Sequence, residues 1–288
     1  MSDRWPDPPP LFDLDDLDPE PSASAAPAGA PAPAVAPASA PVADSLPAAE
    51  SPMALAERRS RLIERVAVFD LETTGVDVTE DRIVTAYVGL LDASGEVIHS
   101  ESWLAHPGVE IPEAASAIHG ITTAQARAEG RPAAEVVAEI VHALRTVLAG
   151  GIPVVAYNAA FDLSMLKNEA QRHGVEPIVD PHPVIDPLVI DKTVDRYRKG
   201  KRTLDLVAAH YAVALESAHE ASADAIAAGR VALAIAERYA ETLPPTLEEL
   251  HTQQISWARA QAESLTEYFI RIGRLEPTEA LDGSWPIR

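Results

Sequence analysis

The chain carries RVAVFDLETTGVD at residues 65–77, where an apolar run ends in two carboxylates, Asp70 and Glu72, followed by Thr-Thr-Gly. The run at 66–69 is typical of a buried β-strand. Side chains two residues apart lie on the same side of a strand, so both carboxylates should project together. Burying unpaired carboxylates is costly. We therefore expect either that the strand ends at the surface here or that a cation lies between the two acids.

The composition sets limits on the class of protein. The chain has 288 residues, 47% of them hydrophobic, and no cysteine. This length suits one large domain or two small ones, and the lack of cysteine excludes disulfides and thiolate metal sites. The sequence has no apolar run long enough to cross a membrane, and its first residues are acidic. We therefore expect a soluble, cytoplasmic protein with no membrane partner.

The formal net charge of −21 at first argues against nucleic acid as a partner, because phosphate binding normally uses a basic surface. However, part of this acid lies within the first 20 residues. Carboxylates that hold metal ions must also be counted together with their metals. Whole-chain charge therefore does not exclude nucleic acid.

The sequence divides into three parts. Residues 1–52 predict a disordered, acidic and Pro/Ala-rich tail, which cannot bury enough apolar surface to offset the entropy of ordering. Residues 53–243 have the pattern of a folded domain, and 244–288 predict a C-terminal helical extension that packs on the domain or binds a partner. The start of the tail, residues 4–18, interleaves apolar and acidic side chains. It is either a solubilising segment or a docking motif for a replication or repair protein.

The domain begins with strands and continues with alternating strands and helices. A strand at 64–72 and two strands within 82–105, joined at a turn around 94–95, predict an antiparallel meander. The pattern as a whole indicates an α/β fold with a mixed sheet and helices on its faces. We expect further strands at 152–158 and 183–186, and helices at 132–151, 161–174, 187–195, 203–212, 221–241 and 246–272.

Two more carboxylates lie at the starts of predicted helices. Asp162 follows the strand at 152–158, at a carboxyl end where α/β sheets present functional groups. Asp224 lies in the first turn of a later helix, for which Ser222 is a candidate N-cap, and His219 precedes it in a loop. Taken singly, these residues have ordinary explanations, such as a partner for the helix dipole or an exposed loop histidine.

Three short segments together resemble the motifs of the DEDDh, or DnaQ-like, 3′-to-5′ exonucleases, the family that includes the epsilon proofreading subunit of bacterial DNA polymerase III. They are FDLETTG at 69–75, NAAFD at 158–162 and HEASAD at 219–224, in the family's order. The segment AIHGIT at 117–122 also resembles a loop that many members carry. The resemblance covers about 64–241 and implies a ribonuclease H-like mixed sheet flanked by helices. One departure is Tyr157, where the second motif commonly has histidine.

The resemblance also implies a catalytic mechanism that uses two divalent cations, Mg²⁺ or Mn²⁺. It implies that Asp70 bridges both cations, that Glu72 and Asp224 complete the site for the attacking water, and that Asp162 supports the second cation. His219 would take the proton from that water. Carboxylate oxygens are the ligands that such hard cations prefer.

The same resemblance places the terminal nucleotide beside the first two motifs and the loop at 117–122. His119 is as readily a structural loop histidine. The cluster RYRKGKR at 196–202 is the densest basic segment, and it either holds backbone phosphates or forms a solvated turn. The substrate-binding candidates are Leu71, Thr73, Thr74, Gly75, His119, Asn158, Phe161, Arg198 and Lys201.

We therefore expect a 3′-to-5′ exonuclease that hydrolyses phosphodiester bonds at the 3′ end of single-stranded DNA. An exoribonuclease of the ribonuclease T or oligoribonuclease type is the alternative, because these motifs do not report the 2′-hydroxyl. A third interpretation, from a different class, is a catalytically idle adaptor that binds partners through its tail.

Overall fold

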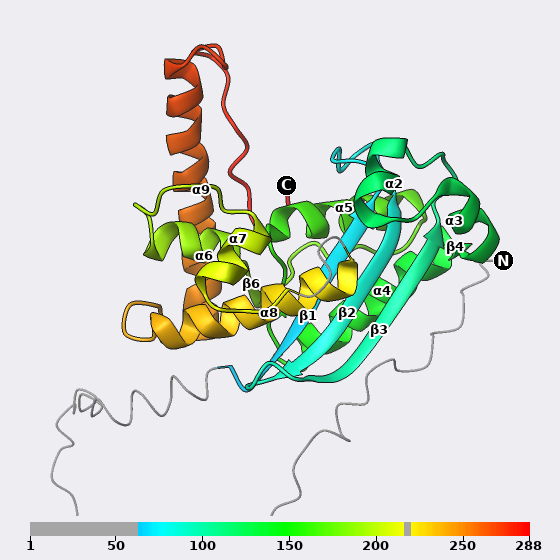
Figure 1. Cartoon of the computed structure of the whole chain (residues 1–288), viewed down its shortest axis with the longest axis horizontal. Helices are drawn as coiled ribbons and strands as arrows, with labels where there is room; N and C mark the ends of the chain where they lie inside the picture. The colour runs from blue at the N-terminus through cyan, green and yellow to red at the C-terminus, as the bar shows by residue number, and fades with distance from the viewer. Residues whose placement is uncertain (1–62, 216–219) are drawn as a thin grey trace, which may run out of the picture.

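The computed structural model describes residues 63–215 and 220–288. The predictions for the tail at 1–52 and for His219 lie outside the described residues. Within them, a six-stranded mixed sheet has the order β4-β3-β2-β1-β5-β6, with helices on both faces (Figure 1). The mixed α/β fold with flanking helices is thus confirmed.

The meander predicted at the start of the domain is present. Strands β1, β2 and β3 pair in antiparallel fashion, while β5 runs parallel to β1 on its other side. Gly95, with φ of 82°, forms the turn between β2 and β3. The strands are β1 Arg65–Thr73, β2 Ile83–Asp92, β3 Val97–His106, β4 Arg131–Pro132, β5 Val154–Val155 and β6 Val184–Ile185.

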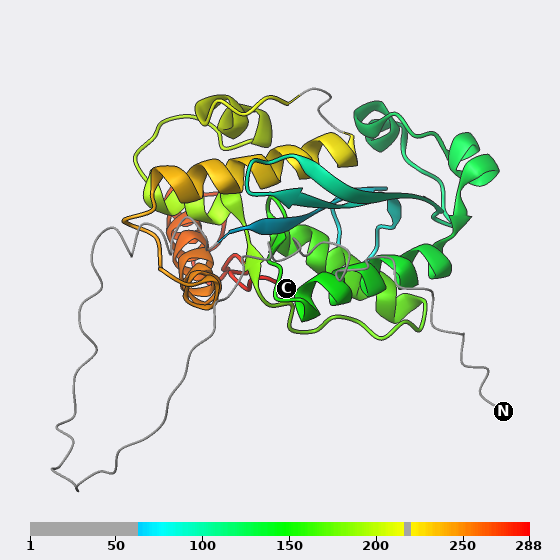
Figure 2. The same ribbon diagram turned by 90° about the horizontal axis from the view of Figure 1, so that it is seen from below.

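The helices form two layers. Helices α4 and α5 cover one face of the sheet and α8 covers the other (Figure 2). They include α2 Glu113–His119, α3 Thr123–Glu129, α4 Ala133–Ala149, α5 Ala159–Arg172, α6 Pro187–Val194, α7 Leu204–His210, α8 Ala221–Arg238 and α9 Leu247–Arg271. None of the helices in the described ranges is long and apolar enough to cross a membrane.

The alternation along β1 decides which layer each side chain meets. Ala67, Phe69 and Leu71 pack in the core with α4 and α5, whereas Val66 and Val68 pack in the core with α8. A strand has a side-chain period of two. The carboxylates that follow Val68 on its side of the strand therefore project toward α8.

The structure corrects several predicted boundaries. Strands β5 and β6 have two residues each, shorter than predicted. After β5, Asn158 adopts a left-handed conformation that ends the extended run. Ser222 is not the N-cap of α8. The helix begins at Ala221, and Glu220 is its N-cap. Helices α2 and α3 were not expected. Ala126 is the only buried side chain in the pair, so neither helix has an apolar period.

The extension predicted at 244–288 folds against the domain. In the first half of α9, His251 Nδ1 accepts a hydrogen bond from the Val184 N–H at 3.1 Å, and Gln254 Oε1 accepts one from the Asp186 N–H at 2.7 Å. The second half of α9 projects from the molecule (Figure 1). The segment that follows returns along α9 and buries Trp285. The boundary at 243/244 stays a prediction.

Close contact between α8 and the sheet depends on Gly229. A Cβ at this position would lie 2.4 Å from Val68 Cγ1 and 2.7 Å from Leu91 Cδ1. Alanine normally favours a helix over glycine by about 1 kcal/mol. Here we expect Gly229→Ala to lower the free energy of unfolding by about 1–3 kcal/mol, because the extra methyl overpacks the core.

Urea unfolding of the variant measures this effect, with Ala234→Gly on the same helix as the control. That control should cost about 1 kcal/mol through helix propensity alone. A rise in stability for Gly229→Ala would contradict the close packing of α8.

Candidate active site

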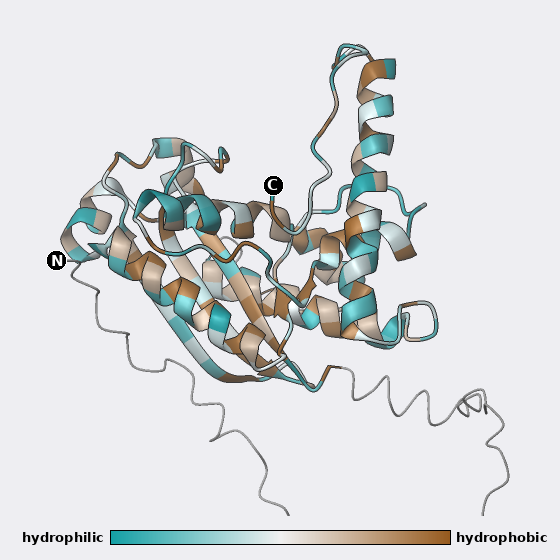
Figure 3. Ribbon diagram, turned by 180° about the vertical axis from the view of Figure 1, so that it is seen from behind, coloured by the Kyte–Doolittle hydropathy of each residue, from teal (hydrophilic) through white to brown (hydrophobic). Residues whose placement is uncertain are grey.

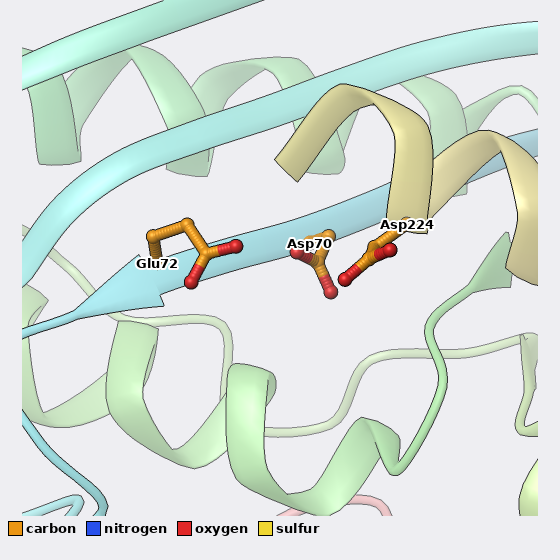
Figure 4. A group of neighbouring side chains, drawn as sticks. All are labelled: Asp70, Glu72 and Asp224. Atoms are coloured by element: carbon orange, nitrogen blue, oxygen red, sulfur yellow. The ribbon is translucent and has the colours of Figure 1, made fainter. Parts of the chain in front are cut away.

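Three carboxylates meet above the end of β1. Asp70 and Glu72 extend from the strand, and Asp224 descends from the first turn of α8 (Figure 4). Each offers an oxygen such that the three atoms lie within 4.8 Å of one another, and all three residues are half-buried. Two elements separated by about 150 residues in the sequence thus bring their acids together. This is the only such cluster found among the described residues.

Asp162 joins the site through a backbone contact. The Ala67 N–H donates to Pro153 O at 2.9 Å, so the N–H groups of alternate residues along β1 face the β5 edge. Beyond Val155, β5 has ended, and no strand offers an acceptor to Leu71. The Asp162 carboxylate takes that role, accepting from the Leu71 N–H at 3.2 Å. This bond ties the start of α5 to the strand that carries Asp70.

Burial of these acids, and then their proximity to one another, raises their pKa values. Burial raises the pKa of Asp70 well above its usual range, and the charges of Asp162, Glu72 and Asp224 raise it further. Burial and then Asp224 raise the pKa of Glu72 to about 7. Burial also raises the pKa of Asp162. Cations would relieve this repulsion, and a set of hard oxygen donors fits Mg²⁺ or Mn²⁺.

Asp186 fixes the start of α5. Its carboxylate accepts hydrogen bonds from the backbone N–H groups of Asn158, Ala159 and Leu188 at 2.9–3.0 Å. It also accepts one from the Trp285 indole N–H at 3.3 Å. The side chain is 1% exposed, and burial raises its pKa. One carboxylate therefore satisfies the first N–H groups of α5 and α6 and anchors the C-terminal segment.

The segment between β1 and β2 is braced rather than open. The Thr74 hydroxyl is buried and donates to Asp81 Oδ1 at 2.8 Å. A Cβ at Gly75 would lie 2.4 Å from Asp81 Oδ2, so a larger residue here would displace the Asp81 carboxylate. Thr73 Oγ1 donates to Gly75 O at 2.6 Å. The hydroxyls of both threonines thus engage the loop itself, and a role in substrate binding stays a prediction.

A buried glutamate supports the same loop from α5. Glu169 is fully buried and accepts from the Ile83 N–H at 3.4 Å. It forms ion pairs with Arg82 and Arg172, and Arg172 in turn donates to Thr79 O at the loop's far side. Since this loop leaves β1 just after Glu72, the network holds the end of the strand in place.

His119 lies beside the carboxylates. It ends α2 and lines a hollow of about 340 Å³ together with Glu72 and Ser222. Its Nδ1 accepts from the Ile121 N–H at 3.2 Å. Burial lowers the pKa of His119, which keeps the imidazole neutral at neutral pH. Its placement is compatible with contact to substrate, and that contact stays a prediction.

The other substrate-binding candidates occupy varied environments. Asn158 is exposed at the start of α5, while Phe161 is partly buried against the core. Arg198 forms ion pairs with Asp191 and Asp195, so its guanidinium braces the loop after α6, and its contact with phosphate stays a prediction. Lys201 is exposed. His219, the predicted general base, lies outside the described residues.

Known proteins identify the fold and the family. The sequence model of the exonuclease (RNase T) family matches residues 67–232, which is more than half of the chain and includes Asp70, Glu72, Asp162 and Asp224. The chain belongs to this exonuclease family, and within it to the DnaQ-like 3′-to-5′ type. The predicted family is thus confirmed.

Individual relatives agree with this assignment. The chain is 32% identical over 187 residues to a PolC-type DNA polymerase III of Lacticaseibacillus paracasei and 30% identical over 185 residues to that of Clostridium perfringens. These matches cover 64% and 63% of this chain but only 12% of each polymerase. E. coli exonuclease I, solved with a dT13 oligonucleotide, aligns with a TM-score of 0.52 at 22% identity, over 62% of this chain and 42% of that chain.

Sequence reasoning missed Asp186 and Glu169. The order Asp186-Pro187 carries a usable signal, because an aspartate before a proline is typical of an N-cap followed by the first helical residue. Glu169 carries none, since a glutamate within a helix usually belongs to a solvated face.

The raised pKa of Glu72 predicts how metal-free stability depends on pH. Between its usual value of 4.5 and about 7, the folded protein keeps a proton that the unfolded chain has released. The free energy of unfolding should therefore fall as pH rises through this window and level off above it. Asp70 acts in the same direction. Urea melts in EDTA at pH 5, 6, 7 and 8 measure the slope.

Glu72→Gln is the control, because it removes this titration and should make the curve shallower, leaving the part due to Asp70. Added Mn²⁺ should stabilise the wild-type protein more at pH 8 than at pH 5, since the cations replace protons. An equal slope in the wild type and the variant would contradict the prediction.

Proposed function

We propose that the protein removes nucleotides one at a time from the 3′ end of single-stranded DNA by metal-dependent hydrolysis. The observation that carries this proposal is the convergence of Asp70, Glu72 and Asp224 within 4.8 Å, with Asp162 fastened to the same strand by the Leu71 N–H. Membership of the exonuclease family supports it independently.

The four carboxylates would hold two divalent cations. Bound there, such cations supply activation of water, neutralisation of phosphate charge and stabilisation of the departing 3′ oxygen. The protein's own contribution is rigid placement. Asp70 and Glu72 are fixed by the pairing of β1 with β2, Asp224 by the close packing of α8, and Asp162 by its backbone contact. Fixed ligands leave little reorganisation at the moment of reaction.

His219 would act as the general base. It lies five residues before Asp224 in the sequence, within the third of the motifs that resemble the exonuclease family. An imidazole with an ordinary pKa of about 6.5 suits removal of a proton from water at neutral pH.

DNA is favoured over RNA by the comparisons. The relatives in which this region occurs are DNA polymerases, and the structurally similar E. coli exonuclease I has been solved with DNA oligonucleotides. We accordingly propose a cytoplasmic role beside DNA synthesis or repair, with residues 4–18 as a docking motif for a replication or repair protein.

A strand labelled at its 5′ end tests the activity directly. With Mg²⁺ or Mn²⁺, a 20-nucleotide DNA strand should shorten stepwise into a ladder, whereas a 3′ label should be released at once as a mononucleotide. EDTA should stop both reactions, because the carboxylates alone cannot activate water. Products that shorten from the 5′ end would contradict the proposal. Faster cleavage of an RNA strand of the same sequence would identify RNA, rather than DNA, as the preferred substrate.

Paired variants at Asp162 separate its two roles. Asp162→Asn keeps an oxygen that can accept the Leu71 N–H but loses the charge, so we expect at least a ~100-fold loss of kcat with a melting temperature close to that of the wild type. Asp162→Ala should lose both activity and stability, because the Leu71 N–H is left without its acceptor.

His219→Ala should lower kcat by about 10²–10⁴-fold while binding of Mn²⁺, measured by calorimetry, persists. Asp180→Asn, an exposed aspartate, is the control for these substitutions and should keep full activity. A kcat for Asp162→Asn equal to that of the wild type would contradict a role for Asp162 in the active site.

A further inference from the structure

A groove lies between α6 and the projecting half of α9. Helix α6 packs against α9 (Figure 1), and the hollow between them has a volume of about 690 Å³. Its walls combine cationic, aromatic and amide side chains, among them Lys192, Arg196, Trp257, Gln261, Tyr268 and Arg271. Helix α9 lies beyond the span matched by the exonuclease family, which ends at residue 232, so one wall of this groove lies outside the matched domain and the other, on α6, lies within it.

The charge of the groove is opposite to that of the chain. The whole protein has a formal net charge of −21, yet the side chains lining this hollow include three cations and, among the described residues, a single carboxylate, Glu267. Such a concentration of positive charge on an acidic protein attracts an anion more selectively than a uniformly basic surface would.

Aromatic surface accompanies these charges. Tyr268 is 44% exposed, and the Arg271 guanidinium carbon lies 5.4 Å from the centre of its ring. The projecting half of α9 shows this mixture of apolar and polar residues (Figure 3). Proteins that bind single-stranded nucleic acid combine a cationic track for the backbone with aromatic rings on which bases stack.

A second hollow extends the groove toward the start of α5, the helix that carries Asp162. This hollow, of about 260 Å³, shares Lys192, Gln261 and Leu265 with the first. At its other end it is lined by Asn158 and Ala160, and the second of these lies two residues before Asp162 on α5. The two hollows together thus extend from α9 along α6 to the start of α5.

We propose that the groove between α6 and α9 binds the upstream part of the single DNA strand whose 3′ end lies at the carboxylates, which rests on the proposed function. Arg196 and Arg271 pair with backbone phosphates, and Tyr268 stacks on a base. From residue 257 to residue 271 the groove follows about 21 Å of helix, a length for roughly six stacked nucleotides.

Nucleic acid fits this groove better than a protein partner does. A protein segment would also contact the aromatic rings, but it would give no reason for the hollow to continue to Asn158 at the start of α5, the helix that carries Asp162. The polyanion explains both the positive charge and the continuity.

Length-dependent kinetics test this proposal on the full chain. The measured quantity is the ratio of kcat/KM for dT20 to that for dT3, because dT3 is too short to occupy the groove. We expect Arg196→Ala/Arg271→Ala to lower this ratio about tenfold. In anisotropy titrations of labelled dT20 in EDTA, the slope of log K against log salt should become shallower by about 1.4, or 0.7 for each lost phosphate contact.

Arg127→Ala/Arg259→Ala is the matched control. It removes two exposed arginines that line neither hollow, one of them on α9 itself, and it should leave both the ratio and the salt slope unchanged. Equal effects from the two double variants, or no effect from either, would overturn the proposal that the groove binds DNA. The exonuclease assignment would not be affected. Wild-type protein that binds dT20 but cleaves neither strand would instead overturn the proposed function.

Tyr268 separates stacking from charge. Tyr268→Ala should weaken binding of dT20 about tenfold, whereas Tyr268→Phe should retain wild-type affinity, because the ring rather than the hydroxyl contacts the base. Equal affinities for the alanine and phenylalanine variants would exclude base stacking at this position. Binding of a protein partner to the groove without any change in DNA affinity would assign it to that partner instead.

Discussion

Strand β1 extends further than its parallel neighbour β5, and the candidate active site depends on this difference in length. Buried backbone N–H groups need acceptors, and once β5 has ended at Val155 the Leu71 N–H can be satisfied only by a group from another element. Asp162 supplies it. The bond that caps the strand edge is therefore also the bond that brings Asp162 to the other carboxylates. The parallel pairing of β1 with β5 also explains why two motifs separated by 91 residues meet.

In the assembled cluster, burial and the neighbouring negative charges disfavour ionisation of the carboxylates. The surrounding structure holds the carboxylates together against this repulsion. The acids come from elements that are each fixed independently: Glu72 from a strand followed by a loop tied to Glu169, and Asp224 from a helix that Gly229 allows to lie against the sheet. None of these supports is a metal ligand. The protein thus keeps the geometry of the site through packing and backbone hydrogen bonds, and bound cations would relieve the repulsion between the carboxylates.

Much of this arrangement was predictable from local patterns. The period of two along β1 placed Asp70 and Glu72 on one side, and the helical period found α4 and α9 to within a few residues. The apolar run at 152–158 could not show where pairing stops, because the left-handed turn at Asn158 depends on Asp186, a residue far along the chain. The groove on α9 was also not predictable, because Tyr268 and Arg271 line a groove only where α6 packs against α9, and the sequence does not show that packing.

Asp186 has a consequence for how this sequence can diverge. Its carboxylate serves two helix starts and the Trp285 indole at once, so any single replacement breaks several contacts and no neighbouring change restores them all. Descendants that retain the C-terminal segment should therefore preserve positions 186 and 285 jointly, and those that shed the segment are released from that pairing. Sequence change in the C-terminal segment is in this way coupled to the residue that supports the starts of α5 and α6.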